Sequence, residues 1–293
     1  MPKPIYPTFH ISQLSTPKAA HDILNAGRFK PYLASNPHLQ VPHTHSFYHI
    51  LFFSDGRGEH TIDFVRFPVR KGMIYFMRPG QVHNWHFTAP ADGYIVNFSQ
   101  TFFDQLSIST QLVDQFPVFG ADVAAQVQLL DKKTQEQVKD IFEKIVSEQS
   151  AQKEGALLMI GTLLLQLLLT VSRNMVDKST NPTVSPSSNT LRDFQQLIEA
   201  KFIDLRLPKD YAKLLFITPH QLNAACKTSA GISAGELIRN RVLLEAKRLL
   251  VNFSLPIGEI ADRLNFPDHP YFIKFFKKHT GMTPEAFRKA NYK

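Results

Sequence analysis

The stretch DHPYFIKFFKKHTGMTPEAFRK, residues 268–289, combines five aromatic residues with five Lys or Arg. Wound onto a helix, Phe272 and Phe276 lie one above the other because they are four residues apart. Lys274 and Lys277 then fall on a different face. The stretch therefore predicts a helix that docks its aromatic side on a small core and presents its basic side outward.

Asp268 is a favourable N-cap for this helix, and Thr283 followed by Pro284 starts the next helix in the same way. The preceding segment IGEIADRLNFP, residues 257–267, predicts a short helix that ends at Asn265. Asn tolerates the left-handed conformation that a tight turn requires. A helix, a tight turn and a capped basic helix together predict a helix-turn-helix unit.

The same pattern occurs earlier in the chain. PKDYAKLLFI, residues 208–217, predicts a short helix, and Thr218 with Pro219 starts a second one. Between the two units, GELIRNRVLLEAKRLL, residues 235–250, predicts one amphipathic helix about 24 Å long. With its flanks, this helix is suited to hold two recognition helices about 34 Å apart, which is one turn of DNA.

Residues 191–293 resemble the DNA-binding domain of the AraC/XylS family of bacterial transcription regulators. The matching positions in the second half are Ala246, Leu249, Leu250, Ile260, Ala261, Phe266, Tyr271, Phe272, Phe276, Lys277, Gly281, Thr283, Pro284, Phe287 and Arg288. The chain departs from the family at Phe216 and Asn265, where a Gly is usual in the turn. The resemblance implies an all-α domain that binds double-stranded DNA and activates transcription by contacting RNA polymerase.

Two groups of side chains are expected to contact DNA. Base edges would be read by His220, Gln221 and Asn223 in the first recognition helix and by His269, Tyr271, Ile273 and Lys274 in the second. Asn and Gln can pair with adenine, Lys can reach guanine, and Ile or Tyr can touch a thymine methyl group. Phosphates would be contacted by Lys227, Arg239, Arg241, Lys277, Lys278 and Arg288.

The positive charge is concentrated in this part of the chain. Residues 191–293 hold 17 Lys and Arg against 10 Asp and Glu, whereas residues 1–190 hold 16 against 15. The whole-chain charge of +8 therefore comes almost entirely from one end, as is typical of a polyanion-binding module. Just before this basic part lies KSTNPTVSPSSNT, residues 178–190, whose composition predicts a linker.

Residues 5–101 carry short apolar runs broken by Gly, Pro and Asp. The runs YHILFFS, HTIDFVRF, GMIYFM and GYIVNFS predict strands, and SDGRGE at residues 54–59 predicts a hairpin turn between the first two. Several short strands at this spacing predict a β-sandwich or barrel.

Residues 122–149 and 154–175 predict two helices. In the first, an apolar stripe begins at Val127 and Leu130 and runs on at helical spacing. The second contains ALLMIGTLLLQLLLTV, which is 16 residues long and thus shorter than the roughly 20 apolar residues of a membrane-spanning helix. We expect it to be buried or to form a homodimer interface, and not to span a membrane.

Seven of the 12 histidines lie between residues 38 and 86. The arrangement VPHTHSFYHILFFSDGRGE…GMIYFMRPGQVHNWHF resembles the cupin barrel, in the form of the effector-binding arm of AraC-type regulators. His43, His45 and His49 stand where cupin enzymes carry His-x-His-x3-Glu, and His83 stands where they carry their last metal ligand. Because residues i and i+2 of a strand share a face, His43 and His45 are both expected to point into the barrel mouth.

Three interpretations of this histidine mouth stay open: an organic-effector pocket, a metal site, or structural histidines. Imidazole suits Zn, Cu, Fe and Ni, but His49 replaces the carboxylate. Trp85 offers a flat apolar wall and Arg78 a partner for an anion or hydroxyl group. We expect an effector pocket without metal or cofactor, lined by His43, His45, His49, Arg78, His83 and Trp85.

The expected function is a sequence-specific DNA-binding transcription activator that responds to a small-molecule effector, with a sugar as one class. The chain lacks a Gly-rich phosphate cradle, a G-x-S-x-G elbow and a paired-carboxylate motif, so we expect no enzyme. Two alternatives remain: a metal-dependent cupin enzyme or metal sensor fused to a DNA-binding domain, and a DNA-binding protein whose barrel serves only partner contact.

The N-terminus shows no continuous apolar run typical of a secretory signal, and the lone Cys226 excludes an internal disulfide, so a cytoplasmic protein is expected. The expected domains are a cupin-like effector-binding domain at 1–121, a helical packing or dimerisation segment at 122–177, the linker at 178–190 and the DNA-binding domain at 191–293.

Overall fold

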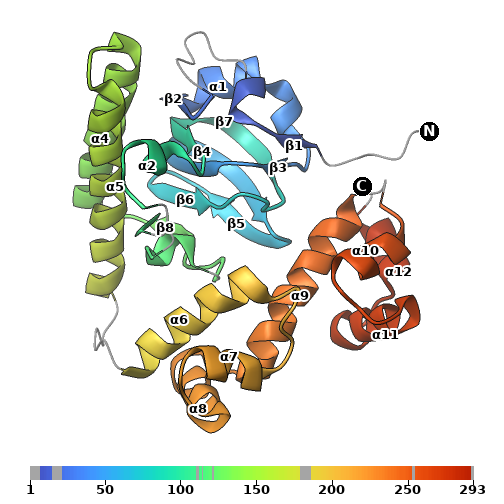
Figure 1. Cartoon of the computed structure of the whole chain (residues 1–293). Coiled ribbons are helices and arrows are strands. Elements are labelled where there is room, and N and C mark those ends of the chain that lie inside the picture. The colour runs from blue at the N-terminus through green and yellow to red at the C-terminus, as the bar shows by residue number, and fades with distance from the viewer. Residues whose placement is uncertain are drawn as a thin grey trace. The chain divides into compact units, whose positions relative to one another are not determined.

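The computed structural model describes residues 7–14, 22–109, 112–113, 115–120, 122–178, 186–252 and 255–291. These residues fall into two compact units, one within residues 7–182 and the other within residues 183–293. The first unit contains a β-sheet with helices packed on it, and the described part of the second unit is helical (Figure 1). The structure thus has the mixed class expected, with a sheet-rich N-terminal unit and an all-α C-terminal unit.

The N-terminal unit is built around two long strands. Its strands are β1 (Thr8–Phe9), β2 (Leu24–Arg28), β3 (Thr44–His45), β4 (Tyr48–Ile62), β5 (Val65–Val69), β6 (Met73–Met77), β7 (His83–Phe98) and β8 (Val127–Leu129). Its helices are α1 (Phe29–Ser35), α2 (Phe102–Gln105), α4 (Lys132–Ala151) and α5 (Ala156–Lys178), with 3-10 turns at Ile11–Gln13, Pro37–Gln40 and Pro117–Phe119.

The larger sheet has the strand order β2-β7-β4-β6-β8, and β5 also pairs with β4. Strands β4 and β7 run antiparallel over nearly their whole length, from Tyr48 opposite Phe98 to Ile62 opposite His83. The short parallel pair β1–β3 and a bridge between His43 and His83 join the chain preceding β4 to this sheet. The pairing of distant segments brings residues 43–49 beside the start of β7.

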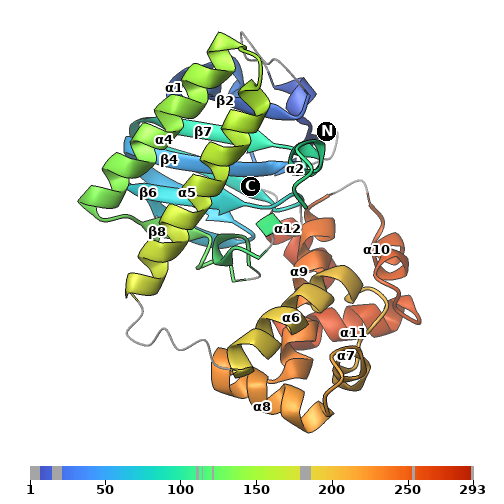
Figure 2. The ribbon, with the colours of Figure 1, turned by 60° about the vertical axis from the view of Figure 1, so that its left-hand side comes forward.

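Side chains of β4 alternate between two cores because successive residues of a strand point to opposite faces. Ile50 and Phe52 lie in the core formed with α4 and α5, where the Phe52 ring stacks on Phe142 with ring centroids 6.2 Å apart. Leu51 and Phe53 lie in a second core, which we call the interior. The two helices cross one face of the sheet side by side (Figures 1 and 2).

The predicted hairpin turn at residues 54–59 is wrong, because this segment continues β4. Gly56 and Gly58 adopt φ of 136° and 150° where the pairing with β7 is irregular. A Cβ on Gly58 would lie 2.2 Å from the carbonyl oxygen of His86, so the glycines permit bulges and a close strand approach. The turn into β5 occurs instead at Asp63 and Phe64, both of which have positive φ.

The helix predicted from residue 122 begins only at Lys132. Val127 belongs to β8, where it pairs with Tyr75, and Leu130 follows that strand. The Asp131 side chain accepts a hydrogen bond from the Thr134 backbone N–H and caps the helix there. The apolar stripe thus starts on α4 at Val138 rather than at Val127.

Helix α5 is long and apolar enough by length and composition to cross a membrane, over Ala156–Met175. In this unit, however, Leu164, Leu167 and Leu168 are fully buried in the core with α4 and the sheet. This burial agrees with the expected packed helix. The opposite face of α5 exposes Leu158, Met159 and Leu169.

The predicted linker at residues 178–190 is shorter than expected. Lys178 ends α5, and residues 186–190 form the start of a further helix, because Pro186 is favourable at the first position of a helix. Residues 179–185 lie outside the described residues.

The C-terminal unit consists of α6 (Pro186–Lys201), α7 (Pro208–Leu214), α8 (Pro219–Ala230), α9 (Ala234–Val251), α10 (Ile257–Arg263), α11 (His269–Thr280) and α12 (Pro284–Ala290). The helix-turn-helix pairs α7–α8 and α10–α11 pack on α9 (Figure 1). One core unites them, with Phe272 and Phe276 of α11 fully buried as predicted.

The two helix-turn-helix pairs of the C-terminal unit, α7–α8 and α10–α11, contain the same turn. Phe216 has φ 54° and Asn265 has φ 53°, so both occupy the left-handed region. The backbone N–H of the following residue, Ile217 or Phe266, donates to the carbonyl of Ala212 or Ala261 respectively. The predicted caps are also present, since the side chains of Thr218, Asp268 and Thr283 each accept a backbone hydrogen bond at a helix start.

Candidate functional site

Five histidines gather in the interior of the N-terminal unit. His43 precedes β3, His45 lies on β3, His49 and His60 lie on β4, and His83 begins β7. None of the five is more than 3% exposed. The mouth inferred from the sequence is thus a buried cluster.

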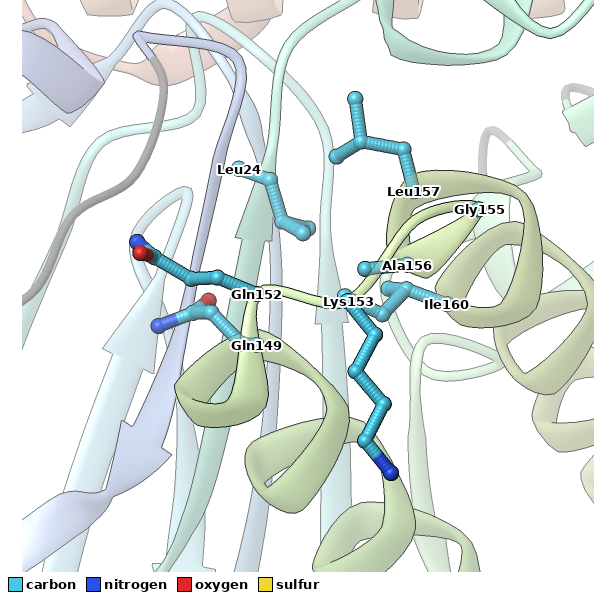
Figure 3. Close-up of a pocket in the computed structure, with 8 residues that line it drawn as sticks. All are labelled: Leu24, Gln149, Gln152, Lys153, Gly155, Ala156, Leu157 and Ile160. Carbon is cyan, nitrogen blue, oxygen red and sulfur yellow. The ribbon is translucent and has the colours of Figure 1, made fainter.

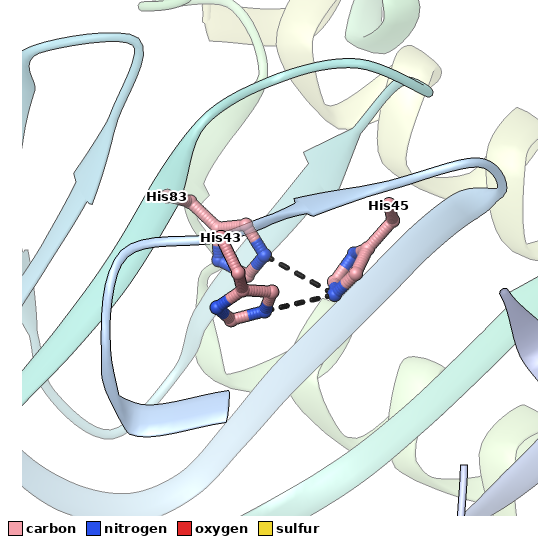
Figure 4. Close-up of side chains that lie close together, drawn as sticks. All are labelled: His43, His45 and His83. Carbon is pink, nitrogen blue, oxygen red and sulfur yellow. Dashed lines mark hydrogen bonds between the residues drawn. The ribbon is translucent and has the colours of Figure 1, made fainter. Parts of the chain in front are cut away.

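Three of these rings meet at one point (Figure 4). His43 Nε2 lies 2.9 Å from His45 Nε2, and His83 Nε2 lies 3.3 Å from the same atom. His60 Nε2 lies 3.1 Å from His83 Nδ1 on the far side of that ring. His60 is one of the seven histidines noted in the sequence, but no role was predicted for it.

The hydrogen bonds determine which nitrogen of each neutral ring carries its proton. His43 Nδ1 donates to the carbonyl oxygen of Val41 at 2.7 Å, so His43 Nε2 holds a lone pair. The proton of His45 must then be on Nε2, and both His43 and His83 accept from it. His83 therefore donates from Nδ1 to His60 Nε2. One proton at the centre is shared between two acceptors.

His49 lies next to the hydrogen-bonded histidines His43, His45, His83 and His60, but its own bond is to Asn97. Its Nδ1 donates to Asn97 Oδ1 at 2.7 Å. Among the residues that the structure describes, His49 Nε2 has no hydrogen-bond partner, and neither has Trp85 Nε1. Trp85 is only 4% exposed and packs edge-on against His83, with ring centroids 5.1 Å apart.

Burial keeps these imidazoles neutral. Removal from water lowers the pKa of His43 to about 4 and that of His49 to about 3. The pKa values of His45, His60 and His83 also fall well below 6.5, first through burial and then through the neighbouring imidazoles. Neutral rings can accept hydrogen bonds or bind metal.

Arg78 is half-exposed at the start of the loop after β6, where its backbone N–H donates to Gln81 Oε1. The structure therefore brings together His43, His45, His83 and Trp85 of the predicted effector residues, with His49 adjacent.

A hollow of about 470 Å³ in the N-terminal unit lies where α4 turns into α5 (Figure 3). Gln149 lines it, and its side chain also bonds the N–H and the C=O of Ala26 in β2. Leu24, Leu157 and Ile160 supply apolar surface, and Lys153 extends away from them. Sequence reasoning did not anticipate this hollow.

Most predicted DNA contacts are exposed on α8, α9 and α11. The exposed residues are His220, Gln221, Lys227, Arg239, His269, Tyr271, Ile273, Lys274, Lys277 and Lys278. The polar residues of α8 also have structural roles, since Gln221 Oε1 accepts from the Thr218 N–H and Asn223 Oδ1 accepts from the Ala234 N–H. His269 Nε2 lies 3.1 Å from Asp262 Oδ1.

Two predicted phosphate contacts, Arg241 and Arg288, make interactions within the protein. Arg241 is held by Glu199 and Glu245 at 2.9 Å each and stacks over the Phe202 ring. Arg288 is 7% exposed and donates to the carbonyl oxygens of Leu250 and Leu255. Because these interactions within the protein already occupy their donors, the structure disfavours both as phosphate contacts.

A groove of about 480 Å³ lies between the two helix-turn-helix units of the C-terminal unit. Its lining includes Arg239, Tyr271, Lys274 and Lys278 from the predicted set. Arg206 and His279 also line it, and sequence reasoning missed both. The basic lining suits a phosphate backbone.

Comparison with known proteins yields matches to both units. Residues 33–168 match the AraC-like ligand binding domain, and residues 211–290 match a helix-turn-helix domain. The HTH-type transcriptional activator RhaR of Enterobacter sp. (strain 638) is 21% identical over 246 residues, covering 84% of this chain and 86% of that protein. The arabinose operon regulatory protein of Salmonella typhimurium is 25% identical over 228 residues, 76% of each chain.

Among solved structures, the C-terminal domain of AraT, a response regulator from Geobacillus stearothermophilus, is 32% identical. It covers 37% of this chain and 88% of its own, with a TM-score of 0.33.

Acid should destabilise the N-terminal unit. Its buried histidines have lowered pKa values, so in acid they bind protons more readily in the unfolded chain than in the folded cluster. The pKa of His43 is near 6.5 in the unfolded chain and about 4 in the folded protein. Its contribution to the unfolding free energy is therefore complete above pH 6.5 and is lost as the pH falls from 6.5 through 4. His43 alone should cost about 3 kcal/mol of unfolding free energy by pH 4. Urea unfolding of metal-free full-length protein, followed by fluorescence of Trp85, the single Trp, measures this loss.

His86→Gln provides the control, because His86 is exposed and lies outside the buried cluster; the variant should lose stability in acid as the wild-type protein does. An unfolding midpoint constant between pH 7 and pH 5 would contradict the burial argument.

Arg288→Ala should lower the stability of the C-terminal unit by roughly 2–4 kcal/mol, because two buried carbonyls lose a charged donor. Lys289→Ala, at the exposed neighbouring position, should change stability by less than about 0.5 kcal/mol. Far-UV circular dichroism during urea unfolding compares the two. A stable Arg288→Ala protein that binds DNA weakly would return Arg288 to the phosphate contacts.

Proposed function

Because the chain belongs to the AraC family of transcription regulators, we propose that it activates transcription by placing α8 and α11 in successive major grooves of DNA. The observation that carries this proposal is the duplicated, capped helix-turn-helix on the two sides of α9. Helix α9 has 18 residues and is thus about 27 Å long. That length supports a spacing near one DNA turn between recognition helices.

Helix α11 is the proposed main reader of sequence. Tyr271 is 54% and Ile273 is 39% exposed, and Lys274 is exposed beside them, so all three are available to base edges. In α8 the carbonyl oxygens of Gln221 and Asn223 accept hydrogen bonds within the protein, which disfavours bidentate pairing with adenine. Base contacts from α8 would come first from His220.

The proposed phosphate contacts are Lys227, Arg239, Lys277 and Lys278, all of which are exposed. These contacts position the protein on DNA without reading sequence. In this proposal RNA polymerase is the second macromolecular partner, and the protein acts in the cytoplasm.

The N-terminal unit is the proposed sensor, with residues 1–121 as effector domain, 122–177 as packing and dimerisation segment and 191–293 as DNA-binding domain. AraC-family regulators bind small effectors, and here the effector would be held among the interior histidines beside Trp85. The neutral, hydrogen-bonded rings support this placement. Ligand binding would alter DNA binding through the difference in affinity between two states. The family consists of regulators, and we propose no catalytic step.

The homodimer is proposed from the outer face of α5. Leu158, Met159 and Leu169 are between 45% and 57% exposed there. A second copy of the same face would cover this apolar surface, as in a two-fold symmetric contact.

Replacing Lys274 by Ala should weaken binding to the cognate operator by about 10-fold or more and leave random DNA less affected. Lys277→Ala, on the same helix, should weaken both DNAs alike and reduce the salt slope by about one unit. Fluorescence anisotropy with an operator selected from a random library measures both. Equal losses for Lys274→Ala on both DNAs would make it a phosphate contact, and salt-independent binding would refute the DNA-binding proposal.

Charged substitutions on α5, Leu158→Glu with Leu169→Glu, should convert the dimer to monomer because they place charge in an apolar contact. Leu129→Glu is the matched control, since Leu129 is 43% exposed on β8, outside α5. Sedimentation velocity at micromolar concentration distinguishes the species. A monomeric wild-type protein under these conditions would contradict the dimer.

A further inference from the structure

We infer that His43, His45 and His83 bind one first-row transition-metal ion, which is the ligand of the N-terminal unit. This inference rests on the proposed function, because it names the chemical class that the sensor unit takes. The ligand atoms of the three histidines lie within 4.8 Å of one another. His43 and His45 lie two residues apart at β3, and His83 comes from the start of β7, so the fold adds a distant third ligand to a pair that is close in the sequence.

The spacing of the nitrogens suits a metal. Zinc binds imidazole nitrogen at about 2.0–2.1 Å, which places two tetrahedral ligands about 3.3 Å apart. His45 Nε2 lies 2.9 Å from His43 Nε2 and 3.3 Å from His83 Nε2. Both distances from His45 Nε2 are within a few tenths of an ångström of this tetrahedral spacing, and the ligand atoms of all three rings lie within 4.8 Å of one another.

The space between the rings suits an ion better than an organic molecule. The ring centroids of His43, His45 and His83 are 4.2, 4.6 and 4.8 Å apart. Phe47 stacks on His45 at 4.4 Å, and Trp85 packs edge-on against His83. A sugar ring inserted between these imidazoles would have to separate all of them.

The tautomers already have the form that a metal requires. His43 and His83 carry their protons on Nδ1 and aim Nε2 lone pairs at His45 Nε2. A single proton there serves two acceptors. If it moves to His45 Nδ1, a cation in its place meets three lone pairs at once.

The remaining nitrogens form the support that ligating histidines usually have. Val41 carbonyl oxygen accepts from His43 Nδ1, and His60 Nε2 accepts from His83 Nδ1. Such partners fix the ring orientation and raise ligand basicity. His60 is therefore a positioning residue, which acts on the metal through His83.

The donor set defines the class of ion. Three neutral imidazoles suit Zn²⁺, Co²⁺, Ni²⁺, Cu²⁺ or Fe²⁺, whereas Mg²⁺ and Ca²⁺ prefer oxygen. At the position of the enzyme carboxylate, His49 engages Asn97 through Nδ1 and has no partner for Nε2 among the described residues. The site thus lacks the carboxylate of the cupin enzymes.

The test uses full-length protein stripped with chelator and titrated with Co²⁺, Zn²⁺ or Mg²⁺. We expect one Co²⁺ per chain, visible absorption bands of tetrahedral Co²⁺, and quenching of Trp85 fluorescence because Trp85 packs against His83. Zn²⁺ should displace Co²⁺ and raise the midpoint of thermal unfolding. Mg²⁺ should do neither.

Three variants make the result specific. His45→Gln should weaken Co²⁺ binding by about 100-fold or more, and His60→Gln should weaken it by about 10-fold with unchanged stoichiometry. His86→Gln, an exposed histidine of β7, should leave binding unchanged. Near-UV circular dichroism checks that each variant folds, and an unfolded His45→Gln would shift the decision to His60→Gln.

The inference is overturned if folded wild-type protein takes up no stoichiometric Co²⁺ or Zn²⁺, or if His60→Gln and His45→Gln bind as tightly as wild type. Metal uptake is measured without DNA, and operator binding is measured without metal. A protein that binds its operator but no metal loses only this inference, whereas one that binds metal but no DNA loses the proposed function.

Discussion

The pleat of β4 is the constraint on which the N-terminal unit depends. Because alternate residues must face opposite ways, one strand supplies Ile50 and Phe52 to the helical core and His49, Leu51 and Phe53 to the interior side. A shift of one residue in register would exchange the two sets and bury the wrong side chains. The long pairing with β7 holds the register and brings His83 and Trp85 to the interior.

Local signals in the sequence predicted the C-terminal unit well. N-caps, Pro at helix starts and aromatic spacing act within one turn, so α8, α11 and α12 begin where expected. The interactions of Arg241 with Glu199 of α6 and of Arg288 with Leu250 of α9 were not anticipated, because they join helices that are distant in the sequence. In the N-terminal unit, the glycines at residues 56 and 58 signal a turn by composition, but they accommodate a neighbouring strand that the sequence does not reveal.

The histidine cluster, too, could be predicted only in part from the sequence. The spacing of His43 and His45 predicted a shared face, and the cupin resemblance added His83. The position of His60 in the cluster was not predicted, because it depends on β4 continuing through residues 54–59. The tautomers, which decide what the cluster can bind, follow only from three-dimensional contacts such as that with Val41.

Burial of the cluster also affects the rate at which a ligand could exchange with solvent. His43, His45 and His83 are at most 3% exposed, so whatever binds them enters and leaves through a local opening of the unit. Exchange of a bound ligand then requires this opening in addition to diffusion in solution. A regulator with such a buried site responds to a sustained change in ligand concentration and less to a brief one, because the ligand exchanges more slowly than at an exposed site.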